Sequence, residues 1–464
     1  MTWVGLSYLL VLVATVTAVG RVADIAGRKL LYTYGFGVFI LGSALCGLTP
    51  SLAALAGFRV LQAVGAAMLQ ANSVAIIYLA LPRASLGRGI GIQGAAQALG
   101  LALGPAAGGL LLAAGGWQLI FLINVPLGLA GLGAGWLLIP RSRHLQQRVP
   151  FDWAGLALFM PAITALLSAA TLGNRAGWTS PVITGLLAGA AVLGPGFVRW
   201  ERRARAPMLD TSLFRSPAFT SGIASGLLSY LAMFGVLLVA PVYLERALRA
   251  SSGRAGLELT VMPLCLAVVA PPAGRLADRC GPRLLTAAGM TIVAGMLIAL
   301  ALGRPGQLTL ITGLAVVGAG LGLFTPPNNA AIMAAAPRRQ SGMAGGVLNM
   351  TRGTGTALAL ALTGAAYELG ASPWQGFRIA VLFLASMSAA AALLASGRGH
   401  RPGEPGTVDS RHRRGPGPPA RPITGLTGPM LLAPGRECTF CTRWAGRSRS
   451  CASSVLHAAP RRPL

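Results

Sequence analysis

Two short loops concentrate charge in a chain that is otherwise strongly apolar. They read GRVADIAGRK from residue 20 and GRLADRCGPR from residue 274. An aspartate at a helix end accepts hydrogen bonds from backbone N–H groups, and an arginine four residues along can pair with it. Contacts of this kind hold one conformation and release another, so we expect a conformational latch. Its expected residues are Gly20, Asp24, Gly27, Arg28, Gly274, Asp278 and Arg279.

Two arginines lie inside apolar stretches. Arg59 belongs to FRVLQAVGAA, and Arg352 belongs to LNMTRGTGTALALALTG. An ionisable side chain within a bilayer is costly and usually functional, whereas the alternative is that Arg59 reaches toward the lipid headgroups. Other polar side chains are candidates for lining a substrate cavity, with hydrogen bonding between helices as the simpler alternative. The cavity candidates are Gln93, Gln97, Asn328, Asn329, Asn349 and Arg352.

Small residues recur at a helical spacing in GLALGPAAGG. Gly100, Gly104 and Gly108 would share one helix face, with Gly109 beside them, and such a face lets another helix approach closely in lipid. Pro105 lacks a backbone donor and should bend the helix. The stretch therefore predicts a close helix–helix contact beside a bend.

Carboxylates are scarce among the apolar stretches. Glu258, in RAGLELTVMP, enters an apolar run and is a candidate proton carrier. The alternative is that Glu258 lies at a solvated helix end.

Composition points to a membrane protein. Of the 464 residues 54% are hydrophobic and 11% are charged, and the mean hydropathy is +0.65; about a quarter of a soluble domain is charged. The net charge of +27 comes from arginines in short loops and in the tail, which form no basic face with aromatics, so we expect no nucleic-acid partner. The apolar region lacks a nucleophile–base pair, a nucleotide-binding loop and a metal cluster, which predicts no enzyme activity, no cofactor and no metal.

About thirteen apolar runs are long enough to cross a bilayer, which predicts an all-helical, polytopic membrane protein. The arginines concentrate in alternate loops between the runs, and since such loops are cytoplasmic, both charged loops should face the cytoplasm. The runs cover residues 3–19, 30–49, 52–81, 87–114, 118–139, 152–173, 181–198, 217–244, 255–273, 284–303, 307–333, 341–367 and 376–396.

The charged loops also mark an internal repeat, because the second starts 254 positions after the first. Two runs precede the second loop within its half, but only one precedes the first, so the symmetry predicts that the first half lacks its first helix. A start codon placed too late or a degraded gene would explain this. We expect a helical half at 1–140, two linking helices with loops at 141–216, and a second half at 217–398.

The tail, residues 399–464, is rich in proline, glycine and arginine, which predicts a disordered segment. Its residues Cys438, Cys441, Cys451 and His457 imitate a zinc site, but chance spacing in a disordered tail is the favoured interpretation.

These motifs together resemble the major facilitator superfamily, in its fourteen-helix drug/proton antiporter branch (EmrB/QacA-like). GRVADIAGRK is similar to the family's loop between the second and third helices, RVLQAVGAA to its fourth-helix motif, GLALGPAAGG to its fifth-helix antiporter motif, and WQLIFLINVPLG to the start of its sixth helix. The resemblance implies two pseudo-symmetric halves plus two linking helices, and a proton-coupling role for Arg59. It also implies an acidic first helix with an LDxTIVNVAL-like stretch, which this sequence does not contain.

The expected function is proton-coupled efflux of drugs or other amphipathic small molecules by alternating access. Two alternatives remain open: a solute permease of the same fold, and a truncated remnant that transports nothing. The expected partners are the small-molecule substrate, protons and the lipid bilayer. We expect a monomer in the cell membrane with a cytoplasmic tail.

Overall fold

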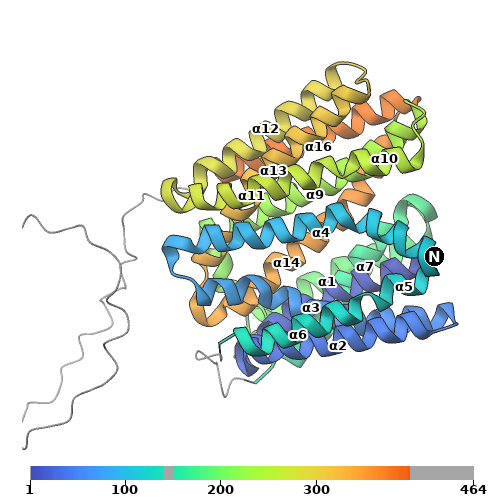
Figure 1. Cartoon of the computed structure of the whole chain (residues 1–464). Coiled ribbons are helices and arrows are strands. Elements are labelled where there is room, and N and C mark those ends of the chain that lie inside the picture. The colour runs from blue at the N-terminus through green and yellow to red at the C-terminus, as the bar shows by residue number, and fades with distance from the viewer. Residues whose placement is uncertain (1, 141–149, 398–464) are drawn as a thin grey trace, which may run out of the picture. The chain divides into compact units, whose positions relative to one another are not determined.

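The computed structural model describes residues 2–140 and 150–397, and nearly all of them are helical (Figure 1). Within these residues twelve helices are long and apolar enough to cross a membrane. They match twelve of the expected runs, and the remaining run, 341–367, forms an interrupted helix. The expected all-helical membrane fold is therefore confirmed. The tail and its cysteines lie outside the described residues.

A first bundle contains the amino-terminal helices. In it α1 and α2 both pack along α3, and α2 also packs along α6. The run expected at 118–139 forms two helices, α5 and α6, which meet at Ile123. The helices are α1 (Thr2–Ala26), α2 (Arg28–Leu48), α3 (Leu52–Ala80), α4 (Leu86–Gly115), α5 (Trp117–Leu122) and α6 (Asn124–Leu138), with a short 3₁₀ turn η1 (Arg83–Ser85) before α4.

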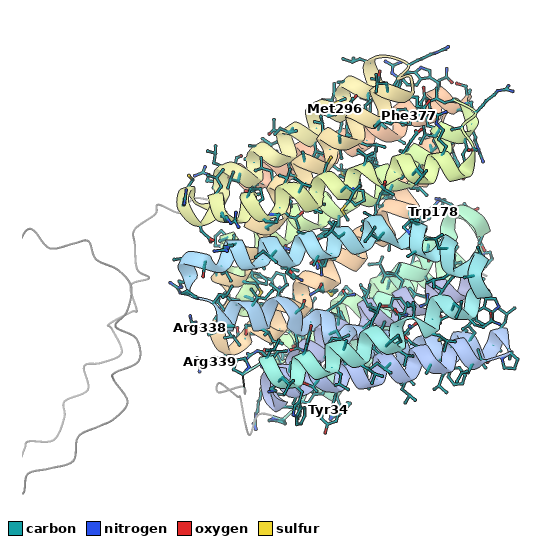
Figure 2. The ribbon with its side chains drawn as sticks, viewed as in Figure 1. Tyr34, Trp178, Met296, Arg338, Arg339 and Phe377 are labelled. Atoms are coloured by element: carbon teal, nitrogen blue, oxygen red, sulfur yellow. The ribbon has the colours of Figure 1, made fainter. Side chains whose placement is uncertain are left out.

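A second bundle contains the carboxy-terminal helices, and Figure 2 shows Met296 and Phe377 within it. Fully buried side chains such as Leu297, Phe324 and Phe377 build its core. The helices are α9 (Pro217–Arg246), α10 (Ser252–Leu259), α11 (Val261–Cys280), α12 (Pro282–Leu302), α13 (Gln307–Ala335), α14 (Ser341–Leu358), α15 (Gly364–Glu368) and α16 (Pro373–Ser396), with a 3₁₀ turn η3 (Arg338–Gln340) before α14 and a π-helical segment η4 (Ala359–Thr363) after it.

In each bundle, a glycine with a positive φ within the charged loop ends the preceding helix. Gly27 separates α1 from α2 with φ of 111°, and Gly281 separates α11 from α12 with φ of 82°. These are left-handed conformations that glycine adopts without a steric penalty. The matching turns show that the sequence repeat is also a structural repeat.

The repeat places an interruption at the same point in α4 and α14. Because α4 begins at Leu86 and α14 at Ser341, Pro105 of α4 corresponds to Leu360 within η4. Pro105 has no N–H to donate, and a π-helical segment widens the hydrogen-bond spacing. Both helices therefore lose regular α-helical bonding at this level.

Two further helices link the bundles in sequence. They are α7 (Trp153–Ala176) and α8 (Pro181–Glu201), which pack against each other, and α7 also contacts α1 and α14. Leu167 of α7 is fully buried in a cluster with Val13 and Ala357. Asp152 caps α7, since its Oδ1 accepts the Gly155 N–H at 2.8 Å. The linking pair is thus packed against the contact between the bundles.

Contact between the two bundles is made mainly by two helix pairs, α1 with α14 and α4 with α11. Each pair joins a helix of one half to a helix of the other. The charged loops stand at one end of both pairs, and that end is called the clamp end below.

Candidate functional site

Asp24 joins the two bundles at the clamp end. It is the third residue from the end of α1 and is fully buried. Its Oδ1 accepts the N–H of Gly342 at 2.8 Å, and its Oδ2 accepts that of Met343 at 2.9 Å. These N–H groups belong to the first turn of α14, where they lack partners within the helix. A carboxylate of the first half therefore caps a helix of the second half.

Arg28 completes this contact from the start of α2. Its Nη2 lies 2.5 Å from Asp24 Oδ1 and donates to the carbonyl oxygens of Arg338 and Arg339 at 3.3 and 3.4 Å. Figure 2 shows Arg338 and Arg339 at the clamp end, with Trp178 toward the opposite end. Arg28 is 2% exposed, so the ion pair is buried. The "first clamp" is Asp24, Arg28, Gly342 and Met343.

The second charged loop makes the converse contact. Asp278 Oδ1 accepts the N–H of Gly87 at 2.7 Å, and Oδ2 accepts that of Arg88 at 2.9 Å. A carboxylate of the second half thus caps α4 of the first half. Arg279 does not take the part of Arg28 that the sequence led us to expect: it is exposed, and the position equivalent to Arg28 is Pro282. The "second clamp" is Asp278, Gly87 and Arg88.

Paired glycines bring the capped helices into backbone contact. A Cβ added to Gly20 would collide with the carbonyl oxygen of Gly342, and a Cβ added to Gly342 would lie 2.5 Å from that of Gly20. Gly274 and Gly87 stand in the same reciprocal relation. Residues with a Cβ would separate the helices and pull each carboxylate away from the N–H groups it caps.

One turn further along, the same close approach repeats. A Cβ on Gly346 would lie 2.9 Å from Thr17 Cα, and one on Gly91 would lie 2.7 Å from the Ala270 carbonyl oxygen. Gly87 and Gly91 of α4 are therefore required by packing against α11, and Gly342 and Gly346 of α14 by packing against α1.

Beyond the clamps, Arg352 centres a polar network that spans both bundles. Its Nε donates to Tyr230 Oη at 2.5 Å, its Nη1 to Asn349 Oδ1 at 3.1 Å and its Nη2 to Gln97 Oε1 at 2.6 Å. Asn349 Nδ2 donates in turn to the Gln70 carbonyl oxygen at 2.9 Å. These five residues, from α3, α4, α9 and α14, are called the central polar network. The repeat that relates α4 to α14 makes Gln97 the counterpart of Arg352.

The other three expected cavity residues lie outside this network. Gln93 Nε2 donates to Ser73 Oγ at 3.3 Å, linking α4 to α3. Asn328 Nδ2 donates to the Gly222 carbonyl oxygen at 3.1 Å, linking α13 to α9, and Asn329 is 4% exposed. The contacts of Gln93 and Asn328 match the simpler alternative of hydrogen bonds between helices.

Arg59 lies near the start of α3, toward the end opposite the clamps. Its guanidinium stands 4.6 Å from the ring centre of Tyr8 and 5.2 Å from that of Phe121. Its Nη1 donates to Gln62 Oε1 at 2.8 Å, and Gln62 Nε2 donates to Ser43 Oγ at 2.6 Å. Aromatic faces and a buried amide thus stabilise this cation within the first bundle.

Glu258 lies in α10, in the second bundle, also toward the end opposite the clamps. Its Oε1 is 3.2 Å from Arg254 Nε and also accepts from Gln307 Nε2. Its Oε2 is buried and has no hydrogen-bond partner among the described residues. Glu258 and Arg59, the two expected proton-coupling residues, therefore belong to different bundles.

The glycine face of α4 differs from the prediction. A Cβ added to Gly100, Gly104, Gly108 or Gly109 would meet nothing within 4 Å. At the equivalent of Gly100 in α14, a Cβ on Gly355 would lie 2.8 Å from the Leu227 carbonyl oxygen of α9. The described residues of the first half contain no counterpart of α9, so the expected close helix contact is not formed.

A loop contact beside the first clamp was not expected from the sequence. Gln340 Nε2 donates to Asp210 Oδ2 at 2.7 Å, and the Ser212 N–H donates to Asp210 Oδ1 at 2.9 Å. Burial alone would raise the pKa of Asp210, but the hydrogen bonds from Ser212 and Gln340 outweigh it and leave that pKa below its ordinary value. Asp210 precedes Thr211 and Ser212 in a helix-capping pattern that could have been noticed.

Tyr230 was also missed. A tyrosine within an apolar run usually needs a hydrogen-bond partner when buried, and this was the available signal.

Within the described residues no three His, Cys, Asp or Glu side chains are grouped to hold a metal ion.

Known proteins share this sequence pattern. The Major Facilitator Superfamily model matches residues 1–200 and 222–441. The riboflavin transporter RibZ of Clostridioides difficile is 35% identical over 77% of this chain and 78% of its own. The multidrug resistance protein Stp of Mycobacterium tuberculosis is 33% identical over 78% and 68%, and the methylenomycin A resistance protein of Bacillus subtilis is 31% identical over 85% of each chain.

Solved structures share the fold. The human organic anion transporter MFSD10 (TETRAN) aligns with a TM-score of 0.63 over 85% of this chain and 83% of its own, at 16% identity. The proton:xylose symporter XylE aligns with a TM-score of 0.59 over 83% of each chain, at 14% identity. With reciprocal clamps, paired bundles and matching relatives, the chain is a multi-pass integral membrane protein that belongs to the Major Facilitator Superfamily, whose members transport small molecules and are not enzymes.

Proposed function

We propose that this protein exports amphipathic small molecules in exchange for protons by alternating access, as part of the fourteen-helix drug/proton antiporter branch. The observation that carries the proposal is the reciprocal pair of clamps, which joins the bundles at the clamp end through hydrogen bonds that a rocking motion can break and remake. The antiporter-type stretch around Pro105 and the relatives named for drug and methylenomycin A resistance support export.

The proposal includes the expected orientation and division of the chain. The clamp end carries the arginine-rich loops, so we place it at the cytoplasmic face of the cell membrane, with the tail on the same side. The halves at 1–140 and 217–398, the linking segment at 141–216 and a monomeric state belong to the same proposal. A clamped cytoplasmic end corresponds to a conformation closed toward the cytoplasm.

We also propose that an additional apolar helix covers the glycine face of α4 in the active transporter. The support is the difference between Gly355, which packs against the backbone of α9, and its counterpart Gly100, which meets nothing within 4 Å. This is the position that the internal repeat assigns to the expected first helix. A glycine face of this kind suits close helix packing in lipid.

Dye efflux tests the function. Cells that lack their own exporters, and that express this chain, are loaded with rhodamine B, and efflux is followed with and without a protonophore. We expect efflux that the protonophore abolishes. Arg59→Ala should slow it about tenfold or more, because one hydrogen bond to a charged group is worth about 1.5–3 kcal/mol. Glu258→Gln tests the carboxylate, and Arg304→Gln, a loop change, is the matched control.

The outcomes separate the alternatives. Efflux that the protonophore leaves unchanged contradicts proton coupling. Absence of efflux despite confirmed membrane insertion favours the truncated remnant, and repeating the assay with a longer amino terminus tests the missing helix. Riboflavin uptake without dye efflux favours the second candidate, a solute permease, which the similarity to RibZ supports.

A further inference from the structure

Arg352 lies well along α14 from the clamp end. It is separated from the start of α14 at Ser341 by eleven residue steps, which is about 16 Å along an α-helix. The apolar layer of a bilayer is about 30 Å thick, so a helix that starts near one face brings this residue near the middle. The guanidinium remains charged at any physiological pH. A permanent cation therefore stands near the centre of the membrane.

The hydrogen-bond partners of Arg352 are neutral oxygens. They are the phenol of Tyr230 and the amide oxygens of Asn349 and Gln97. The guanidinium also stands 5.1 Å from the ring centre of Tyr230. These contacts orient the guanidinium without neutralising its charge.

The carboxylates of the described residues lie elsewhere. Each occurs at or near a helix end or in a loop, and none lies in the middle of a spanning helix. The salt bridges found among the described residues join Arg28 to Asp24 and Arg254 to Glu258. The carboxylates are Asp24, Asp152, Glu201, Asp210, Glu245, Glu258, Asp278 and Glu368. Within this part of the chain, the charge of Arg352 has no acidic counterpart.

The network is also open to a solute. Gln97 is exposed and Arg352 is half-buried, although Tyr230 and Asn349 are almost fully buried. The exposed amide of Gln97 and the half-buried guanidinium of Arg352 therefore leave the network within reach of a solute.

We infer that the central polar network is a binding site for the acidic group of an amphipathic anion, such as a carboxylate on an aromatic ring system. Arg352 supplies the charge and a fork of N–H donors that suits a carboxylate. Tyr230 accepts from Arg352, so its own hydroxyl hydrogen is free to donate to the anion. Gln97 and Asn349 hold the guanidinium in place. The inference rests on the proposed export function, for which it names the substrate class.

Two dyes that differ in one group test this site. Rhodamine B carries a free carboxylate, and its ethyl ester has the same aromatic system without that charge. Binding of each dye to the full chain in lipid nanodiscs is measured by equilibrium dialysis, with empty nanodiscs subtracted. We expect the wild-type protein to prefer the acid. Arg352→Gln should weaken binding of the acid about tenfold or more and leave binding of the ester nearly unchanged.

Further variants keep the test decisive. Arg352→Lys retains the charge and should keep part of the preference for the acid dye. Tyr230→Phe should reduce that preference, and Arg304→Gln should leave it intact. The inference is overturned if the wild-type protein binds both dyes equally, or if Arg352→Gln weakens both equally. The wild-type comparison needs no variant to fold. Acid preference without rhodamine B efflux contradicts the proposed function alone, whereas rhodamine B efflux without acid preference contradicts this site alone.

Discussion

At the scale of single residues, Asp24 and Asp278 perform the same capping in different surroundings. Asp24 is fully buried and forms an ion pair with Arg28, whereas Asp278 is only half-buried and the position equivalent to Arg28 is occupied by Pro282. Both carboxylates accept two backbone N–H groups from the opposite half. The two clamps therefore share a geometry but differ in charge.

This difference predicts unequal costs of mutation. Asp24→Asn leaves Arg28 buried without its counter-ion, and breaking a buried pair costs about 3–5 kcal/mol. Asp278→Asn weakens a cap, which costs about 1 kcal/mol. Melting temperatures of the purified proteins in detergent should fall much further for Asp24→Asn. Changing Asp24 and Arg28 together to Asn and Gln should recover part of the loss. Equal falls in melting temperature for Asp24→Asn and Asp278→Asn would contradict the difference in charge between the two clamps.

The sequence predicted the residue types of the clamps but not their partners. Asp24 and Asp278 stood out because aspartate, glycine and arginine recur together in an apolar chain. Their partners, Gly342 and Gly87, are 318 and 191 positions away, and they offer only backbone N–H groups, which no side-chain pattern reveals. Arg352 stood out as a charge inside an apolar run, but its partner Tyr230 depends on tertiary packing.

At the scale of helices, α4 carries two kinds of glycine. Gly91 faces the backbone of α11, and a Cβ there would lie 2.7 Å from the Ala270 carbonyl oxygen, whereas a Cβ at Gly100 meets nothing within 4 Å. Glycines at the same helical spacing therefore lie in a tight helix–helix contact at one point of α4 and on an uncovered face at another. Only the structure separates these two uses.

The two glycines form a matched pair for mutation. Gly91→Ala should destabilise the protein by about 1–3 kcal/mol, because crowding a packed contact forces the helices apart. Gly100→Ala should be neutral, or stabilise by about 0.5–1 kcal/mol through better helix propensity. Melting temperatures of the two variants, measured side by side, provide the comparison. A comparable loss in Gly100→Ala would show that a further helix covers this face in the purified protein.

At the scale of the whole molecule, the proposed alternating access acts on both clamps through one motion. Separation of the bundles at the clamp end breaks both clamps, because each joins a helix of one half to a helix of the other. Weakening either clamp therefore shifts the same equilibrium between closed and open forms. The free-energy effects of two lesions should add, since the clamps share no residue.

A buried position between the bundles reports this equilibrium. Ala75 of α3 is fully buried. A Cβ added to Gly345 of α14 would lie 3.7 Å from the Cβ of Ala75. In a protein whose native cysteines are replaced, Ala75→Cys should react slowly with a soluble maleimide. Asp24→Asn and Asp278→Asn should each speed the reaction, and the double variant should multiply the two factors. A double variant no faster than the faster single variant contradicts a shared opening.

The fold itself was largely readable from the sequence. Long apolar runs, loop arginines and the repeated loops predicted the helices and their membrane setting, because the bilayer imposes length and hydropathy on each span. The break within 341–367 was missed, since a π-helical segment leaves no apolar gap. Contacts of α7 with α1 and α14 were missed as well, because helix packing depends on shape rather than on hydropathy.

The aligned interruptions at Pro105 and in η4 have a mechanical consequence. They stand at matching levels in the two helices that the clamps hold, beyond Gln97 and Arg352 when counted from the clamp end. Each interruption is a joint about which the outer part of its helix can bend while the inner part stays fixed. The end of the bundles opposite the clamps can then open and close while both clamps stay formed. On the proposed mechanism, a solute leaves at that end without any separation of the bundles at the clamp end.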